Sequence, residues 1–128
     1  MENYDRERGD SGSIRIANEV VGIIAGIAAS EVKGVAGMSG GVVDGIAELL
    51  KKKNMSKGVK VEVGEKEAAV DLYVIIEYGA KVPDVAYAVQ ENVKKAIESM
   101  TGLRVVEVNV HIQGVDFKPE ETEEPRVR

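Results

Sequence analysis

The chain has 128 residues, a hydrophobic content of 44% and a formal net charge of −5, the size and balance of one globular domain with a hydrophobic core. It contains no cysteine, which excludes disulfide frameworks, thiolate metal sites and thiol nucleophiles and is typical of a cytoplasmic protein. The acidic balance argues against a general affinity for nucleic-acid phosphates or anionic lipid, because such binding depends on clustered Lys and Arg.

The two ends of the chain are polar. Residues 1–12 carry alternating charges without the apolar core of a signal peptide, and residues 118–128 combine two prolines with four glutamates. We expect both tails to be disordered, which leaves one domain over residues 13–117. The longest apolar run, Val20–Ala29, is far shorter than the roughly 20 residues that span a bilayer and predicts a buried helix.

The first half of the domain predicts a strand and two helices. Alternation at residues 13–16 (SIRI) is typical of a short strand, and a helix is expected over residues 17–32. Five of the fourteen glycines then fall within residues 34–45, which predicts a bend before a second helix at residues 42–53. The expected inward residues are Val20, Val21, Ile24, Ile27 and Ala28 in the first helix and Val42, Val43, Ile46, Leu49 and Leu50 in the second.

The second half predicts three strands and a helix. Residues 59–63 and 68–78 alternate like the strands of a hairpin. Pro83 suits the first turn of a helix that ends at Gly102, and residues 104–112 close the domain as a strand. In that strand we expect Val106, Val108, Val110 and Ile112 to face inward and Val105, Glu107, Asn109 and His111 to face outward.

The predicted order is therefore β-α-α-β-β-α-β. It indicates an α+β fold with helices on one face of a small mixed β-sheet, in a KH-like or split β-α-β arrangement.

A Gly-x-x-Gly pattern at Gly37 and Gly40 suggests one binding function. In a KH-type RNA-binding domain such a loop joins two helices and clamps the sugar-phosphate backbone, with nearby cations holding phosphates. The candidate cations are Lys51, Lys52, Lys53 and Lys57. The alternative, which we favour, is a bend in which glycines supply positive φ, since the pattern has low specificity and encloses only Met38 and Ser39.

No catalytic, cofactor or metal site is predicted. His111 is the only histidine, so no histidine pair can bind a metal ion, and no serine lies in a Gly-x-Ser-x-Gly elbow. The carboxylates Glu62, Asp71, Glu77 and Glu107 fall opposite the valine stripes, where solvation is the ordinary state. We therefore predict that the protein is not an enzyme.

Four apolar residues break the polarity of that face, namely Ala69, Tyr73, Ile75 and Val105. A sheet needs only one covered face, so apolar side chains on the open one indicate contact with a partner or with another copy of the protein. We predict that these residues form a self-association or partner face.

Three stretches resemble the alkaline shock protein family, the envelope stress response family of Gram-positive bacteria. They are GSIRIANEVVGIIAGIAASEVKGV, AAVDLYVIIEYGAKVPDVAYAVQENVKKAI and MTGLRVVEVNVHIQGV, and the match covers Gly12 to Phe117. The resemblance implies a non-enzymatic cytoplasmic protein of cell-envelope homeostasis that self-associates and reaches the membrane through small membrane-anchored partners. It carries over no catalytic residue.

The resulting hypothesis is a self-associating scaffold or adaptor for a membrane-anchored partner, without insertion into the membrane. A KH-like RNA-binding module is the alternative. A third hypothesis is a regulator that binds a small acyl or metabolite ligand between helices and sheet.

Overall fold

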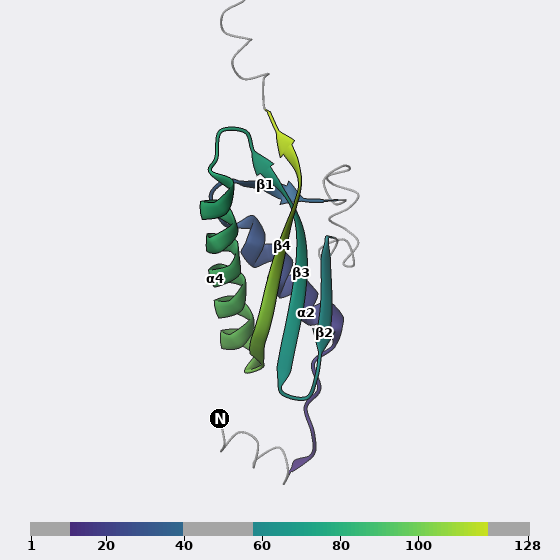
Figure 1. The fold of residues 1–128 in the computed structure, drawn as a ribbon. Helices are drawn as coiled ribbons and strands as arrows, with labels where there is room; N and C mark the ends of the chain where they lie inside the picture. The colour runs from purple at the N-terminus through teal and green to yellow at the C-terminus, as the bar shows by residue number, and fades with distance from the viewer. Residues whose placement is uncertain (1–10, 40–57, 118–128) are drawn as a thin grey trace, which may run out of the picture.

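A computed structural model describes residues 11–39 and 58–117 (Figure 1). The elements are helices α2 (Asn18–Ser30) and α4 (Val82–Thr101) and strands β1 (Val35–Met38), β2 (Val59–Val63), β3 (Glu67–Glu77) and β4 (Arg104–Asp116). Both helices pack against the same core on one side of the sheet, so the predicted α+β class with helices on one face is confirmed. The helix predicted at residues 42–53 lies outside the described residues.

Strand β3 is the centre of a mixed four-stranded sheet. On one edge it pairs in parallel with β4 along its whole length. On the other edge β2 pairs antiparallel with residues 68–72, and β1 pairs antiparallel with residues 74–76. The strands β1 and β2 meet at Tyr73, whose N–H donates to Gly58 O and whose carbonyl accepts from Ser39 N, both at 2.8 Å.

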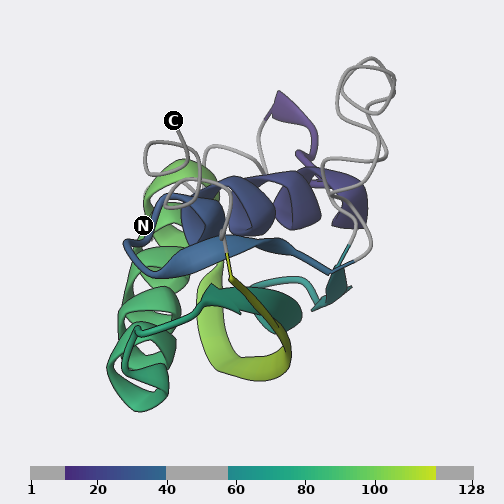
Figure 2. The same cartoon turned by 90° about the horizontal axis from the view of Figure 1, so that it is seen from above.

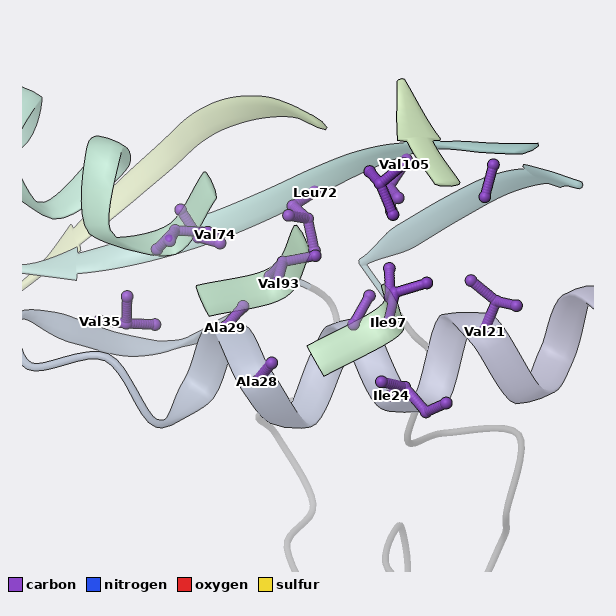
Figure 3. Packing of buried hydrophobic residues seen from close by; sticks show 14 of the residues in the cluster. Val21, Ile24, Ala28, Ala29, Val35, Leu72, Val74, Val93, Ile97 and Val105 are labelled. Carbon is purple, nitrogen blue, oxygen red and sulfur yellow. The ribbon is translucent and has the colours of Figure 1, made fainter. Parts of the chain in front are cut away.

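The core lies between the sheet and the two helices. Its largest fully buried side chains are Leu72, Ile76, Ile97, Val21, Val70, Val74, Val89 and Val93. Figure 3 shows Leu72 and Val74 of β3 turned toward the helices, and Val93 of α4 belongs to the same core cluster. The helices are also tied directly, because Asn92 Nδ2 donates to Ala28 O at 2.8 Å.

The local signals of α4 and of the β2–β3 hairpin produce the predicted elements. Pro83 lies in the first turn of α4, and Gly102 ends the helix with φ 79°, its N–H donating to Glu98 O at 3.0 Å. The hairpin pairs Val59 with Leu72 and Val63 with Ala68. These outcomes confirm the periodicity and the turn signals that predicted them.

The strand predicted at residues 13–16 is wrong. This segment belongs to no regular element in the structure, and it leads directly into α2. Alternation over four residues is a short signal, and both edges of the central strand β3 are already filled, one by β4 and the other by β1 and β2.

The bend predicted for the glycine-rich segment is wrong at residues 35–38, which form β1. Residues 31–34 turn the chain before this strand, with Gly34 at φ 102°, and Val35 enters the core. Pairing with the free edge of β3 overrides the local turn preference of these residues, because strand formation depends on neighbouring strands more than on propensity.

Two residues of the expected α2 stripe, Val20 and Ile27, are 45% and 43% exposed. The helix instead buries its small residues, including Gly22, Gly26 and Ala29. Small side chains allow two elements to approach closely, and α2 contacts α4 as well as the sheet. The second-half pattern also predicts Tyr78 and Met100 to face inward, but both are exposed, because Tyr78 lies just beyond the end of β3 and Met100 lies in the last turn of α4.

A β-bulge in β4 reverses the faces expected near its start. Ala68 pairs with Val105 but Ala69 pairs with Glu107, so Val106 is an extra residue without a partner on β3. Such an insertion flips the side-chain alternation on either side of it. Val105 consequently enters the core at 5% exposure while Val106 is 49% exposed, the reverse of both predictions. Val108, Val110 and Ile112 pack against the core as predicted.

Candidate interaction surface on the open sheet face

The sheet has one face that neither α2 nor α4 covers. Figure 2 shows α2 as a separate layer beside the strands, and the contacts between elements place α4 against β4 and α2 against β1, β2 and β3. We call the opposite side the open face. Its residues are Lys60 and Glu62 of β2, Ala69, Asp71, Tyr73, Ile75 and Glu77 of β3, and Glu107, Asn109 and His111 of β4.

Strand register sorts these side chains into rows. Lys60, Asp71 and Asn109 form one row across three strands, and Tyr73 and His111 form the next. In the following row Ile75 stands between Gly37 and Gly114. Because neither glycine has a side chain, the two residues paired with Ile75 contribute no side-chain cover to it.

The middle rows form a compact group, here called the Tyr73 cluster: Tyr73, His111, Asp71, Asn109 and Lys60. The Tyr73 and His111 rings stack with centroids 4.5 Å apart and planes 12° apart. His111 Nε2 lies 3.2 Å from Asp71 Oδ1, and Lys60 Nζ lies 5.7 Å from the Tyr73 ring centroid. Cross-strand aromatic and charge contacts of this kind hold Tyr73 in one orientation.

The cluster favours the ionised form of its carboxyl group. The hydrogen bond with His111 lowers the pKa of Asp71 below the ordinary value of 3.8, and the hydrogen bond with Asn109 and the charges of His111 and Lys60 add to this effect. Partial desolvation opposes the shift without cancelling it. Asp71 is therefore a fixed negative charge at neutral pH, within hydrogen-bond distance of an imidazole.

Asp71→Asn is expected to make folding stability less sensitive to acid. A carboxyl whose pKa is lower in the folded state contributes stability that is complete above the unfolded value and is lost as pH falls through the folded value. For Asp71 that window lies below 3.8. Urea unfolding across the acid range should show the parent losing more stability than the variant. Equal pH profiles for the parent and the variant would contradict this expectation.

The structure brings together three of the four residues of the predicted face. Ala69, Tyr73 and Ile75 alternate along β3 on the open face and are half-buried there, whereas Val105 faces the core. The sequence placed Asp71, Asn109 and His111 outward but could not pair them. Alternation within each strand was the only available signal, and the register between strands makes the cluster.

The structure places Gly37 differently from the predicted nucleic-acid-binding loop. This residue pairs with Ile75 as part of β1, so it does not belong to a loop between two helices. Gly40, Lys51, Lys52, Lys53 and Lys57 lie outside the described residues. Within residues 11–39 and 58–117, no group of three or more His, Cys, Asp or Glu side chains is placed to hold a metal ion, and neither helix combines the length and apolar content needed to cross a membrane.

Comparison with known proteins gives consistent matches. The family of alkaline shock protein 23, described by a cell envelope-related function, matches residues 6–117. The protein YqhY of Bacillus subtilis (strain 168) is 43% identical over 113 residues, covering 88% of this chain and 84% of the relative. YloU of the same strain is 41% identical over 106 residues, covering 81% and 88%.

A stress response regulator gls24 homolog of Streptococcus pyogenes serotype M3 is 35% identical over 111 residues, which are 86% of this chain and 61% of that protein. Among solved structures, one of the MamM CTD aligns with 78% of this chain and 100% of its own at 16% identity and a TM-score of 0.49.

Proposed function

The chain belongs to the alkaline shock protein 23 family of cell envelope-related function, and we propose that it serves the envelope as a non-enzymatic, self-associating scaffold or adaptor whose open face docks a membrane-anchored partner. The resemblance to the alkaline shock proteins is thereby confirmed. Identity of 35% to a relative named as a stress response regulator supports a role under envelope stress.

The open face is the observation that carries this proposal. Tyr73 and Ile75 are apolar side chains at the centre of a surface whose rim is charged, which is the composition of protein–protein interfaces. Tyrosine is also enriched among the residues that dominate binding energy. Because Tyr73 is already stacked on His111, docking would cost less side-chain entropy than a free tyrosine would require.

The charge of the open face indicates which kind of partner segment it would bind. Among the described residues, the open face carries the carboxylates Glu62, Asp71, Glu77 and Glu107 against the ammonium group of Lys60, so the net charge of these residues is negative. The cytoplasmic flanks of membrane-spanning helices are enriched in Lys and Arg. An apolar centre with an acidic rim therefore fits the basic juxtamembrane segment of an anchored protein. Docking there would hold this chain at the cytoplasmic side of the membrane.

The double variant Tyr73→Lys, Ile75→Lys is expected to lose membrane recruitment. It replaces the apolar centre with charges that repel a basic segment, and the loss of two central contacts should lower binding roughly tenfold or more. The measurement is the share of the protein that sediments with membranes of the native host, parent against variant, after circular dichroism has shown that the variant is folded.

The matched control introduces two lysines on helix α4 instead of on the open face. Tyr87→Lys, Met100→Lys changes two exposed residues of α4 and should sediment like the parent. Equal recruitment of the open-face variant and the parent would mean that this face is not the docking surface.

A further inference from the structure

Within residues 11–39 and 58–117, no strand pairs with the outer edge of β2, so a defined set of its backbone groups points away from β3. Gly58 O accepts from Tyr73 N, and Gly64 N donates to Glu67 O, both at 2.8 Å. In an antiparallel ladder such hydrogen-bonded pairs recur at every second residue. Even-numbered residues of β2 therefore point their N–H and C=O groups toward β3. Val59, Val61 and Val63 direct theirs away from the sheet.

The sequence of this strand, VKVEV, is symmetric in shape and antisymmetric in charge about Val61. When a second copy lies antiparallel with the two Val61 residues opposed, Lys60 of each copy faces Glu62 of the other. Val59 then faces Val63, so every opposed valine pair uses the outward backbone groups and forms a hydrogen-bonded pair. Directly opposed unlike charges stabilise a strand pair, while like charges destabilise it.

We propose that two copies of this chain join edge to edge through β2 and form one continuous sheet about a two-fold axis at Val61. This inference rests on the self-association included in the proposed function, and it identifies the surface through which two copies would associate. Opposed residues of paired strands lie on the same face of a sheet, so the two open faces become neighbours on one surface. The dimer thus presents two Tyr73 clusters, and simultaneous engagement of two partner segments would raise the avidity of docking.

The outer edge of β4 is already occupied near the start of the strand. Along β4, Glu98 Oε2 accepts from Val105 N at 2.9 Å, and Gln90 Nε2 donates to Val108 O at 3.0 Å. These helix side chains occupy backbone groups that another strand could otherwise bind, which is one way in which native sheets protect their edges. At β2 the corresponding contact is weaker, because Asn18 Nδ2 reaches Val61 O only at 3.4 Å and is exposed. A second strand can displace it.

Apolar surface lies beside the β2 edge. Helix α2 passes behind β2 in Figure 1 and contacts it. Val20, two residues from Asn18, is 45% exposed, and the β2 valines are only half-buried. A second copy at this edge would remove part of this surface from water, which adds a favourable term to the backbone and charge pairing.

Charge reversal tests the register of the pairing. Lys60→Glu sets carboxylates opposite each other at both symmetric positions, and Glu62→Lys does the same with ammonium groups. Each single variant should raise the dimer dissociation constant roughly tenfold or more, because every attractive pair becomes repulsive. The double variant Lys60→Glu, Glu62→Lys restores opposite charges and should dimerise like the parent. An equimolar mixture of the two single variants should recover the dimer as a heterodimer.

The molar mass of the parent, of each variant and of the mixture is measured by light scattering over a range of protein concentrations. Lys94→Glu and Glu91→Lys on α4 make the same net-charge changes at exposed positions; they should leave the dimer unchanged. Lys60 also lies over Tyr73, but the double variant lacks that contact too, so its recovery would assign the single-variant loss to strand pairing.

Single variants that dimerise like the parent would overturn the β2 interface and leave the open-face proposal standing. A parent that stays monomeric at every concentration would overturn self-association as well. Dimerisation of Tyr73→Lys, Ile75→Lys at the parent's level, together with loss in the charge variants, would support two separate surfaces.

Discussion

Leu72→Ala is expected to lower the free energy of unfolding by about 3–4 kcal/mol, within the range for truncation of a fully buried leucine. Leu72 is 0% exposed and lies in the middle of the central strand, opposite Val59 on β2 and Val110 on β4. Its side chain faces the helices (Figure 3). Leu72 lies where the sheet packs against the helices, so the surrounding structure can close the cavity left by the truncated side chain only in part.

Chemical denaturation followed by circular dichroism would measure this loss. Leu72→Met is the matched control, because it nearly conserves volume and should cost less than about 1.5 kcal/mol. The slope of unfolding free energy against denaturant should stay the same in both variants if only stability changes. A loss below about 1 kcal/mol for Leu72→Ala would contradict the assignment of Leu72 to the centre of the core.

Gly34→Ala is expected to destabilise the fold by about 2–4 kcal/mol, from backbone strain and a steric clash together. Gly34 has φ 102°, and an added Cβ would lie 2.6 Å from Val85 Cγ2. Val85 is a buried residue of α4 with a stiff, β-branched side chain, so it cannot rotate away freely. The turn that feeds the chain from α2 into β1 requires glycine for this reason.

Gly79 provides a control for the backbone part of this effect. Its φ is 97°, but nothing lies within 4 Å of an added Cβ, so Gly79→Ala should show only the cost of positive φ. Thermal or denaturant unfolding of both variants would separate the two contributions. Adding Val85→Ala to each should reveal coupling with Gly34→Ala alone. Equal losses at Gly34 and Gly79 would argue that the contact with Val85 has no energetic weight.

The sheet gives the proposed adaptor two separable contact regions. The open face carries the Tyr73 cluster and Ile75 at its centre, while the proposed dimer edge runs along β2. Lys60 belongs to both regions because its ammonium group lies over Tyr73 and its position opposes Glu62 in the proposed dimer. Charge swapping within β2 distinguishes the two roles of this residue.

Local sequence signals determined the elements whose stability is encoded within a few residues. Helix α4 begins at the proline signal and ends at Gly102 with a left-handed conformation, and β3 alternates between core and open face as its sequence predicts. Ala69, Tyr73 and Ile75 were placed on one face by the same period of two. Each of these outcomes depends on backbone geometry and periodicity that do not change with the rest of the fold.

Features that depend on pairing between distant segments were decided by the tertiary structure alone. Residues 35–38 form a strand because they pair with the edge of β3, and the bulge at Val106 directs the side chain of Val105 toward the core. The Tyr73 cluster likewise exists because the register of three strands aligns Lys60, Asp71 and His111 with their neighbours. Periodicity within one strand defines a face, but the position of that strand along its partner is set by the packing of the whole domain.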